Sequence, residues 1–364
     1  MTQEQAGQIP IIDISGPLSE LEVARQLVDA AALHGFAYVR NEGKDIPVEA
    51  IESMFQLSKN FFKSPIEEKQ PCKIEKNNKG WVAMHGETLD PKSQKIGDFK
   101  EAMNIGEFVE GKAQQPLPVA FAHHEQELDK FQKHCHSLML RILTLFAIGL
   151  EIDTSSGGSD WFASRHRGPG PSGCTLRLLH YPPIPAGTDY QPDVDIRAGA
   201  HSDYGSITLL FQRPGQPGLE IIPPCTQTQA SSSEKNYSSS APWKPVPVYP
   251  PGTEGDPSPP ILVNIGDLLS HWTNNLLKST VHRVVFPNQA RQGEDRYSIA
   301  YFGHPLGATV LEPVPSERVK ALAVANIGAS TGVKAMTADE HLMSRLKATY
   351  LSMYRNENEE ATAA

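Results

Sequence analysis

Apolar residues in the first 150 positions recur mainly at the spacing of α-helices. Ser19 followed by Glu22 has the pattern of a capping box, and the helical spacing that follows reaches Gly35, a residue typical of helix ends. Further helices are predicted from about residue 47 to 62 and from about 124 to 150, and short strands over 9–14 and 36–39. We therefore expect residues 1–150 to form an N-terminal helical region with short strands that packs on the core.

The periodicity changes near Cys174, after which short apolar runs are separated by turn residues. Several short strands at this spacing favour an all-β sandwich or barrel over a parallel α/β sheet. The pattern therefore predicts a β core over residues 151–336. Its strands are predicted over residues 176–181, 206–212, 219–222, 261–265, 280–286 and 297–302.

Residues 223–260 interrupt these strands with a stretch rich in Ser, Pro and Gly. We interpret it as a loop insertion that is too polar to pack and is mobile at least in part, in which Trp243 is a candidate to dock a short strand. The segment 337–364 is predicted to form a C-terminal helix that frays after Tyr354. One face of this helix carries Leu342, Leu346, Tyr350 and Met353.

The composition limits the class of protein. With 39% hydrophobic and 21% charged residues, the 364-residue chain is not disordered over its whole length. No apolar run is long enough to span a membrane, and the N-terminus lacks the pattern of a secretory signal. The four cysteines are far apart, which argues against a disulfide framework or a structural zinc site. A net charge of -9 disfavours nucleic acid and anionic membranes as partners, and we expect a monomer in the cytoplasm.

Candidate metal ligands occur in the second half of the chain. His201 and Asp203 lie at the end of a predicted strand, where residues two apart point to the same face. Together they provide two-thirds of a 2-His-1-carboxylate site for Fe(II), although a solvated turn would give the same pair. His282 lies in a run of β-branched residues and is the candidate third ligand. A lone histidine in a strand is also common as a structural residue.

Arg296 and Ser298 share one face of another predicted strand. A guanidinium beside a hydroxyl suits recognition of a carboxylate. The alternative is a surface arginine paired with Glu294 or Asp295.

In order, the pieces HxD (201–203), NIGD (264–267), HRV (282–284) and RxS (296–298) resemble the isopenicillin-N-synthase-like branch of the Fe(II)/2-oxoglutarate-dependent oxygenases. The resemblance implies a mainly β fold with flanking helices (α+β), in which a double-stranded β-helix (jelly roll) core carries an N-terminal helical region and a C-terminal helix. It runs nearly end to end, because matching pieces also occur at residues 9–13, 34–39, 61–65, 98–101 and 176–183.

The resemblance implies that His201, Asp203 and His282 are the catalytic iron ligands. It also implies that Arg296 and Ser298 bind the distal carboxylate of 2-oxoglutarate. Tyr181 resembles the tyrosine that hydrogen-bonds this cosubstrate. Two features depart from the family: Leu179 stands where asparagine is frequent, and the stretch 219–261 is longer than usual.

The implied activity is oxidation of an unactivated C–H bond of a small, mostly apolar molecule by O2, with release of succinate and CO2. Hydroxylation is the default, desaturation or cyclisation are variants, ascorbate is a candidate reductant, and secondary metabolism is the expected setting. One alternative is an oxidase that does not use 2-oxoglutarate, like isopenicillin N synthase or aminocyclopropanecarboxylate oxidase. Another is a non-catalytic jelly-roll metal-binding protein. The candidate walls of the substrate pocket are His85, Met103, Phe211, Phe302 and residues 342–346.

Overall fold

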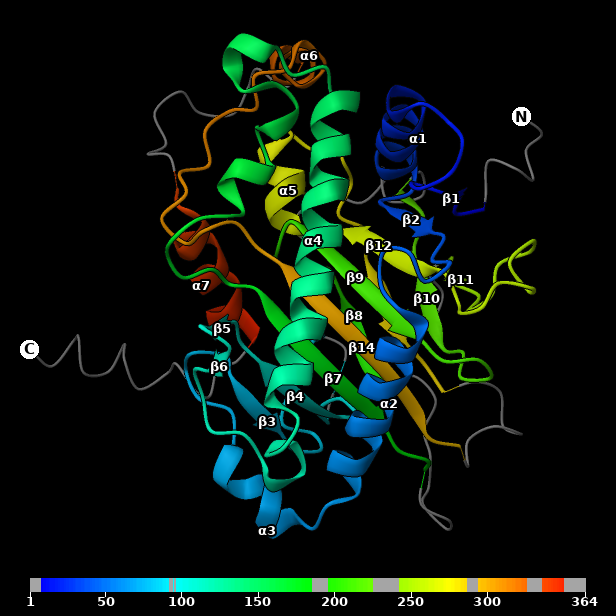
Figure 1. The fold of residues 1–364 in the computed structure, drawn as a ribbon, viewed down its shortest axis with the longest axis vertical. Helices are drawn as coiled ribbons and strands as arrows, with labels where there is room; N and C mark the ends of the chain where they lie inside the picture. Colours follow the sequence, from blue (N-terminus) through cyan, green and yellow to red (C-terminus); the bar gives the residue numbers. More distant parts are fainter. Residues whose placement is uncertain are drawn as a thin grey trace, which may run out of the picture.

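The computed structural model describes residues 8–91, 94, 96–184, 196–224, 242–286, 294–325 and 336–349. Its centre is a pair of β-sheets, with the three longest helices on one side (Figure 1). The large sheet has the strand order β1-β2-β12-β9-β14-β7-β4-β3, and the small sheet has the order β11-β10-β13-β8. This arrangement is the expected mainly β fold with flanking helices, a jelly-roll core.

The strands of the large sheet are β1 (Ile11–Ile12), β2 (Phe36–Val39), β3 (Gly80–Val82), β4 (Glu101–Ile105), β7 (Thr175–Tyr181), β9 (Ile207–Gln212), β12 (Ile261–Ile265) and β14 (Arg296–Gly303). Those of the small sheet are β8 (Ala198–His201), β10 (Leu219–Ile221), β11 (Lys244–Pro245) and β13 (His282–Val284), and β5 (Phe108–Val109) pairs with β6 (Lys112–Ala113). The helices are α1 (Glu20–Leu33), α2 (Val48–Lys63), α3 (Ile66–Lys69), α4 (Glu125–Gly149), α5 (Asp267–Trp272), α6 (Glu317–Ala325) and α7 (Ala338–Thr349). Short 3-10 helices cover Gln70–Cys72, Val119–Phe121, Thr154–Ser156, Gly158–Asp160 and Ala163–Arg165.

Helix α1 begins and ends where the sequence predicts. The Ser19 hydroxyl accepts a hydrogen bond from the Glu22 amide, and the Glu22 carboxylate accepts one from the Ser19 amide, which completes the capping box. Gly35 follows the helix with a φ of +70°, and an added Cβ there would collide with the carbonyl of Lys278 and the hydroxyl of Thr280. The turn therefore requires glycine, and it brings β2 against the segment that leads to His282.

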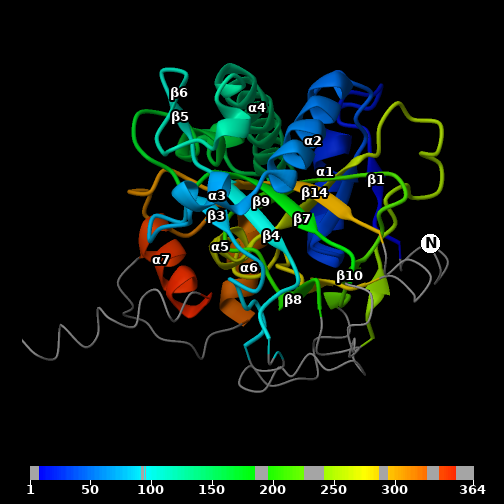
Figure 2. The ribbon, with the colours of Figure 1, turned by 90° about the horizontal axis from the view of Figure 1, so that it is seen from below.

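Helices α1, α2 and α4 cover one face of the large sheet, and the small sheet lies toward the other face (Figure 2). Side chains alternate across the strands accordingly. On β7, Leu176 and Leu178 join the core beneath the helices, whereas Arg177 and Leu179 point to the interior between the two sheets. The inner face of this sheet therefore provides one wall of a cavity.

The structure differs from the predicted elements in its first half. Residues 80–105 contribute β3 and β4 to the large sheet, and β4 pairs with β7. The predicted strand over 9–14 shortens to Ile11–Ile12, because the Asp13 side chain accepts a hydrogen bond from the Ser15 amide and turns the chain. Apolar periodicity did not indicate β4 because its sequence EAMNI does not alternate regularly between apolar and polar residues.

The second half of the predicted insertion packs on the core. Residues 225–241 lie outside the described residues, but Trp243 packs on a small cluster and is followed by β11, which pairs with β10. The Tyr38 hydroxyl donates a hydrogen bond to the carbonyl of Pro247 at 2.5 Å, and Val246 is buried. Trp243 therefore docks a short strand as predicted, whereas the interpretation of 242–260 as an unpacked loop was wrong.

Helix α7 lies at the mouth of the interior between the sheets. Leu342 and Leu346 face Tyr204 in a small apolar cluster. Tyr350, Met353 and the expected fraying after Tyr354 lie outside the described residues. Among the helices that the structure describes, none combines the length and apolar character that crossing a membrane requires.

Candidate active site

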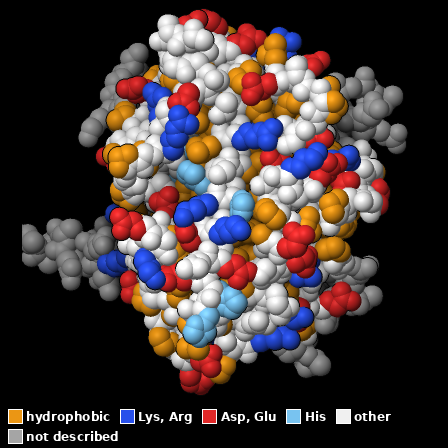
Figure 3. Space-filling model, viewed as in Figure 1, with side chains coloured by type: hydrophobic (Ala, Val, Ile, Leu, Met, Phe, Trp, Pro, Cys, Tyr) orange, Lys and Arg blue, Asp and Glu red, His pale blue; other side chains and the backbone are white. Residues whose placement is uncertain are grey.

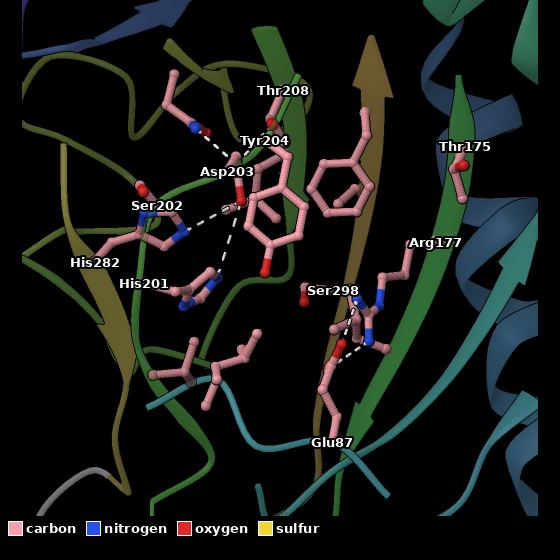
Figure 4. A pocket seen from close by; sticks show the side chains of 18 of the residues that line it. Glu87, Thr175, Arg177, His201, Ser202, Asp203, Tyr204, Thr208, His282 and Ser298 are labelled. Atoms are coloured by element: carbon pink, nitrogen blue, oxygen red, sulfur yellow. Dashed lines mark hydrogen bonds and ion pairs between the residues drawn. The ribbon is translucent and has the colours of Figure 1, made fainter. Parts of the chain in front are cut away.

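Three potential metal ligands meet where β8 and β13 pair. His201 and His282 are direct partners in the register of these strands, and Asp203 follows β8 by two residues. His201 Nε2 lies 3.9 Å and His282 Nε2 lies 3.7 Å from the same atom, Asp203 Oδ1 (Figure 4). One potential ligand atom from each residue lies within 4.8 Å of the other two. The structure therefore brings the three predicted residues together.

Both imidazoles are held in the tautomer that suits a metal. His201 Nδ1 lies 2.7 Å from the carbonyl of Gly199, and His282 Nδ1 lies 3.1 Å from the carbonyl of Thr280. A carbonyl oxygen only accepts, so each Nδ1 is the donor, and the neutral form of each imidazole then has its lone pair on Nε2. Burial lowers the pKa of His201 to about 3, and the nearby His282 adds to this effect. His201 is therefore neutral at physiological pH, as a ligand must be.

The carboxylate is oriented by two residues that sequence reasoning did not assign. Asp203 Oδ2 accepts hydrogen bonds from Thr208 Oγ1 at 2.6 Å and from Asn264 Nδ2 at 2.7 Å. Burial opposes ionisation of Asp203, but His282 and His201 keep its pKa below the usual value. Asp203 is therefore an oriented carboxylate whose other oxygen faces the histidines. The NIGD motif contains Asn264, which is the signal that could have indicated this role.

A buried cation lies on the large sheet at the same cavity. The Arg296 side chain is 1% exposed and lies over the Tyr181 ring, with 4.9 Å between the guanidinium carbon and the ring centroid. Its contacts to Ser298 Oγ at 3.3 Å and Gln212 Oε1 at 3.4 Å are long and neutral. No carboxylate in the described part of the chain forms an ion pair with Arg296, so the site suits an anionic ligand. The alternative pairing with Glu294 or Asp295 is wrong.

The position next to this cation differs from the family pattern. Leu179 pairs with Ser298 across β7 and β14, so it presents an apolar side chain where an amide is frequent. On the other side of β14, Gln212 pairs with Ser298 and provides an amide instead. Sequence reasoning did not select Gln212, although the alternation of β9 places it on the same face as Thr208.

The candidate pocket walls are partly confirmed. Phe302, Leu342 and Leu346 line the cavity. Three predictions about these walls were wrong. Met103 and Phe211 point to the opposite face of the sheet and are buried in the main core, and His85 is exposed.

Further polar and charged side chains line the same cavity. The Arg177 guanidinium contacts both carboxylate oxygens of Glu87, at 2.7 and 3.3 Å, and Lys100 Nζ lies 2.8 Å from Glu87 Oε2. Although burial opposes it, Arg177 and Lys100 hold the pKa of Glu87 well below its usual range. These charges compensate one another within the cavity wall. The remaining lining includes Asn78, Asn104, Thr175, Tyr204, Phe36, Leu89, Leu210 and Leu219.

Comparisons with known proteins agree with this geometry. Residues 9–126 match the profile of the "non-haem dioxygenase in morphine synthesis N-terminal" family, and residues 247–305 match that of the "2OG-Fe(II) oxygenase superfamily". The chain is 36% identical over 345 residues to UPF0676 protein C1494.01 of Schizosaccharomyces pombe, covering 94% of this chain and 93% of that protein. It is 31% identical over 340 residues to the proline hydroxylase BuaE of Petromyces alliaceus, covering 90% of this chain and 93% of that protein.

Among solved structures, a full-length Neurospora crassa protein in complex with α-ketoglutarate and thymine is similar over 93% of this chain and 96% of that chain, with a TM-score of 0.71 and 27% identity. Fold, site and relatives together define the class: the chain belongs to the 2-oxoglutarate–Fe(II) oxygenase superfamily. It is a 2-oxoglutarate-dependent dioxygenase that uses Fe(II) and O2. The alternatives without 2-oxoglutarate or without catalysis are therefore set aside.

Proposed function

We propose that this enzyme hydroxylates an unactivated C–H bond of a small, uncharged ring compound and releases succinate and CO2. The observation that carries the proposal is that the metal-ligand cluster, the buried Arg296 and an aromatic-lined recess share one cavity. Each of these three parts has a separate role.

His201, Asp203 and His282 hold Fe(II) in this proposal. Two neutral imidazoles and one carboxylate suit Fe(II) and leave positions open for other ligands. When bound, the iron supplies the oxidising chemistry with O2. The protein fixes the donor atoms beforehand, because backbone carbonyls orient both histidines and two side-chain donors orient Asp203.

Arg296 and Ser298 bind the distal carboxylate of 2-oxoglutarate, with Tyr181 beside them. A buried guanidinium that has no carboxylate partner among the described residues favours binding of a dianionic cosubstrate at this end of the cavity. Gln212 already contacts the guanidinium and takes the place of the amide that Leu179 lacks. Ascorbate as a reductant belongs to the same proposal.

Two features support an uncharged ring as the substrate. Tyr204 and Phe302 both line the cavity, and their faces suit stacking on a planar molecule. Arg177 is compensated by Glu87, so this pair offers hydrogen bonds without a net charge. The similar Neurospora crassa protein, which was solved with thymine and with 5-formyluracil, supports a pyrimidine base as the first candidate.

A screen for substrate-stimulated succinate release tests this proposal. The enzyme is assayed with Fe(II), 2-oxoglutarate and ascorbate, with thymine, uracil or free proline as the added compound. Succinate release that rises with a pyrimidine above the rate without an added compound supports the ring-compound proposal. A comparison of thymine with uracil, which lacks the methyl group, shows whether the methyl carbon is the one oxidised. Stimulation by proline alone would contradict it. Proline is a meaningful comparison because BuaE is named a proline hydroxylase.

The wider setting is part of the same proposal. We place the enzyme in the cytoplasm as a monomer, in secondary metabolism, without nucleic-acid or membrane partners. The net charge of -9 and the mixture of acidic and basic side chains on the face in Figure 3 disfavour nucleic acid and anionic membranes as partners. We also propose the division into residues 1–150, 151–336 and 337–364 from the change of apolar periodicity along the chain. In this division the N-terminal region contributes β3 and β4 to the large sheet.

A further inference from the structure

A charged network outside the metal site reaches one of the proposed ligands. Asp98 is fully buried, and both Glu87 Oε2, at 2.8 Å, and Asp98 Oδ2 contact Lys100 Nζ. Glu87 in turn holds Arg177. Three of these residues, Glu87, Lys100 and Arg177, line the cavity (Figure 4 shows Glu87 and Arg177). Asp98 is the member of the network that contacts β8.

Asp98 holds the strand that carries His201. Its Oδ1 accepts a hydrogen bond from the Gly199 amide at 3.0 Å, and the carbonyl of Gly199 accepts the hydrogen bond from His201 Nδ1 at 2.7 Å. The neighbouring Phe99 amide donates to the carbonyl of Ile196 at 2.9 Å. The segment at residues 98–99 therefore runs along β8 and fixes it from the side.

This support matters because β8 is an edge strand. In the described sheet, β8 has β13 as its strand neighbour, whereas β13 lies between β8 and β10. The pairing of β8 with β13 is also irregular between His282 and Val284. Two strands therefore hold His282, but one strand and Asp98 hold His201. An edge amide without a strand partner needs another acceptor when it is buried, and Asp98 provides it.

We propose that Asp98 is a positioning residue for the metal site, which sets His201 through Gly199. Lys100 holds Asp98 in place, since despite burial the carboxylates of Asp98 and Glu87 hold the pKa of Lys100 above its usual value and keep it charged beside Asp98 Oδ2. The inference rests on the proposed function, in which His201 is a ligand of Fe(II). Because Lys100 and Glu87 also line the cavity, one network connects the substrate recess with this ligand.

The test compares Asp98→Asn with Glu101→Gln. Glu101 also forms a buried ion pair, at 2.8 Å to Lys69 Nζ, but its other hydrogen bond goes to Trp81 and not to β8. The dissociation constant for Fe(II) is measured anaerobically without 2-oxoglutarate or substrate, together with the melting temperature. Asp98→Asn is expected to weaken Fe(II) binding by about 10- to 100-fold. Glu101→Gln is expected to lower the melting temperature. It is expected to leave Fe(II) binding within about twofold of wild type, because Glu101 does not contact a residue that orients a proposed Fe(II) ligand.

A milder variant keeps the test decisive if Asp98→Asn does not fold. Gln94 Nε2 donates a hydrogen bond to Asp98 Oδ1 at 2.8 Å, so Gln94→Met is expected to weaken Fe(II) binding in the same direction but less. Fe(II) binding equal to wild type in each variant that folds would overturn the role of Asp98 and leave the proposed function standing. A wild-type protein that does not bind Fe(II) would overturn both.

Discussion

His201 and His282 face each other across the β8–β13 pair, with 4.3 Å between their ring centroids, and both direct Nε2 toward one oxygen of Asp203. A carbonyl two residues before each histidine accepts the hydrogen bond from its Nδ1. Two strands therefore present two imidazoles in the same way. This local symmetry explains why the donor atoms of the three residues lie close together.

Replacing Arg296 tests the cosubstrate site. Arg296→Gln removes the buried cation, and the affinity for 2-oxoglutarate is expected to fall by about 30-fold or more, or roughly 2–5 kcal/mol. Arg296→Lys is expected to recover part of this loss, because it keeps the charge without the planar fork. The measurement is a titration of the anaerobic Fe(II) protein with 2-oxoglutarate.

Arg283 offers a control for that titration. It lies on β13 and forms an ion pair with Glu220 at 2.8 Å. It does not line the cavity. Arg283→Lys should leave the titration unchanged, and an equal loss in Arg283→Lys and Arg296→Lys would contradict a specific role for Arg296.

Thr208→Val removes one hydrogen bond to the second oxygen of Asp203 with little change in shape. The carboxylate then rotates more freely, and Fe(II) binding is expected to weaken by about tenfold. Thr175→Val is the matched control, because Thr175 also lines the cavity but donates to the carbonyl of Gly173. Dissociation constants for Fe(II) that are equal in the two variants would show that this hydrogen bond does not orient the ligand.

Gly35→Ala should affect both stability and the metal site. The positive φ alone costs about 1–3 kcal/mol for alanine. The added Cβ also collides with Thr280, whose carbonyl orients His282. Gly43→Ala has a similar backbone cost at φ +84°, but its Cβ would meet only Val48, at 3.6 Å or beyond. Chemical denaturation and Fe(II) titration of both variants should show a larger effect for Gly35→Ala on each quantity. Equal effects would contradict the collision.

The stability of the metal-free protein should decrease as the pH falls from about 6.5 toward 4. Burial lowers the pKa of His166 to about 4 and that of His304 to about 3. In this range the unfolded chain binds protons at these histidines and the folded protein does not, so each contributes about 1.4 kcal/mol of loss per pH unit. Urea unfolding at pH 7, 6 and 5 measures the effect. Stability that stays constant over this range would show that the two histidines are protonated in the folded protein.

Strand alternation within a short segment predicted that His201 and Asp203 share one face and that Arg296 and Ser298 share another, whereas the third ligand and the role of each residue came from the resemblance of the ordered motifs to the family. The partners of these residues depend on register between distant strands. Thr208 lies close to Asp203 in the sequence. In contrast, Asn264 lies on β12, and Gln212 is brought next to Ser298 by the pairing of β9 with β14. The spacing of residues in the sequence does not indicate which residues of two distant strands lie opposite each other.

The errors in the pocket walls have the same origin. Met103 lies on β4, a strand whose sequence EAMNI does not alternate regularly between apolar and polar residues, so apolar periodicity does not indicate it. Without the strand, its face could not be assigned, and Met103 points away from the cavity that Asn104 lines. His85 lies in a loop at a positive φ of 59°, where strand alternation has no meaning.

The central claim is that His201, Asp203, His282 and Arg296 form one site for Fe(II) and 2-oxoglutarate. The most direct measurement is the visible charge-transfer absorption of the anaerobic protein after addition of both, in wild type, His282→Ala and His85→Ala. His85 is exposed and outside the cavity, so its variant controls for the loss of a histidine. We predict the band in wild type and His85→Ala and its loss in His282→Ala, with the fold retained in all three. A band of normal intensity in folded His282→Ala would contradict the assignment of the site.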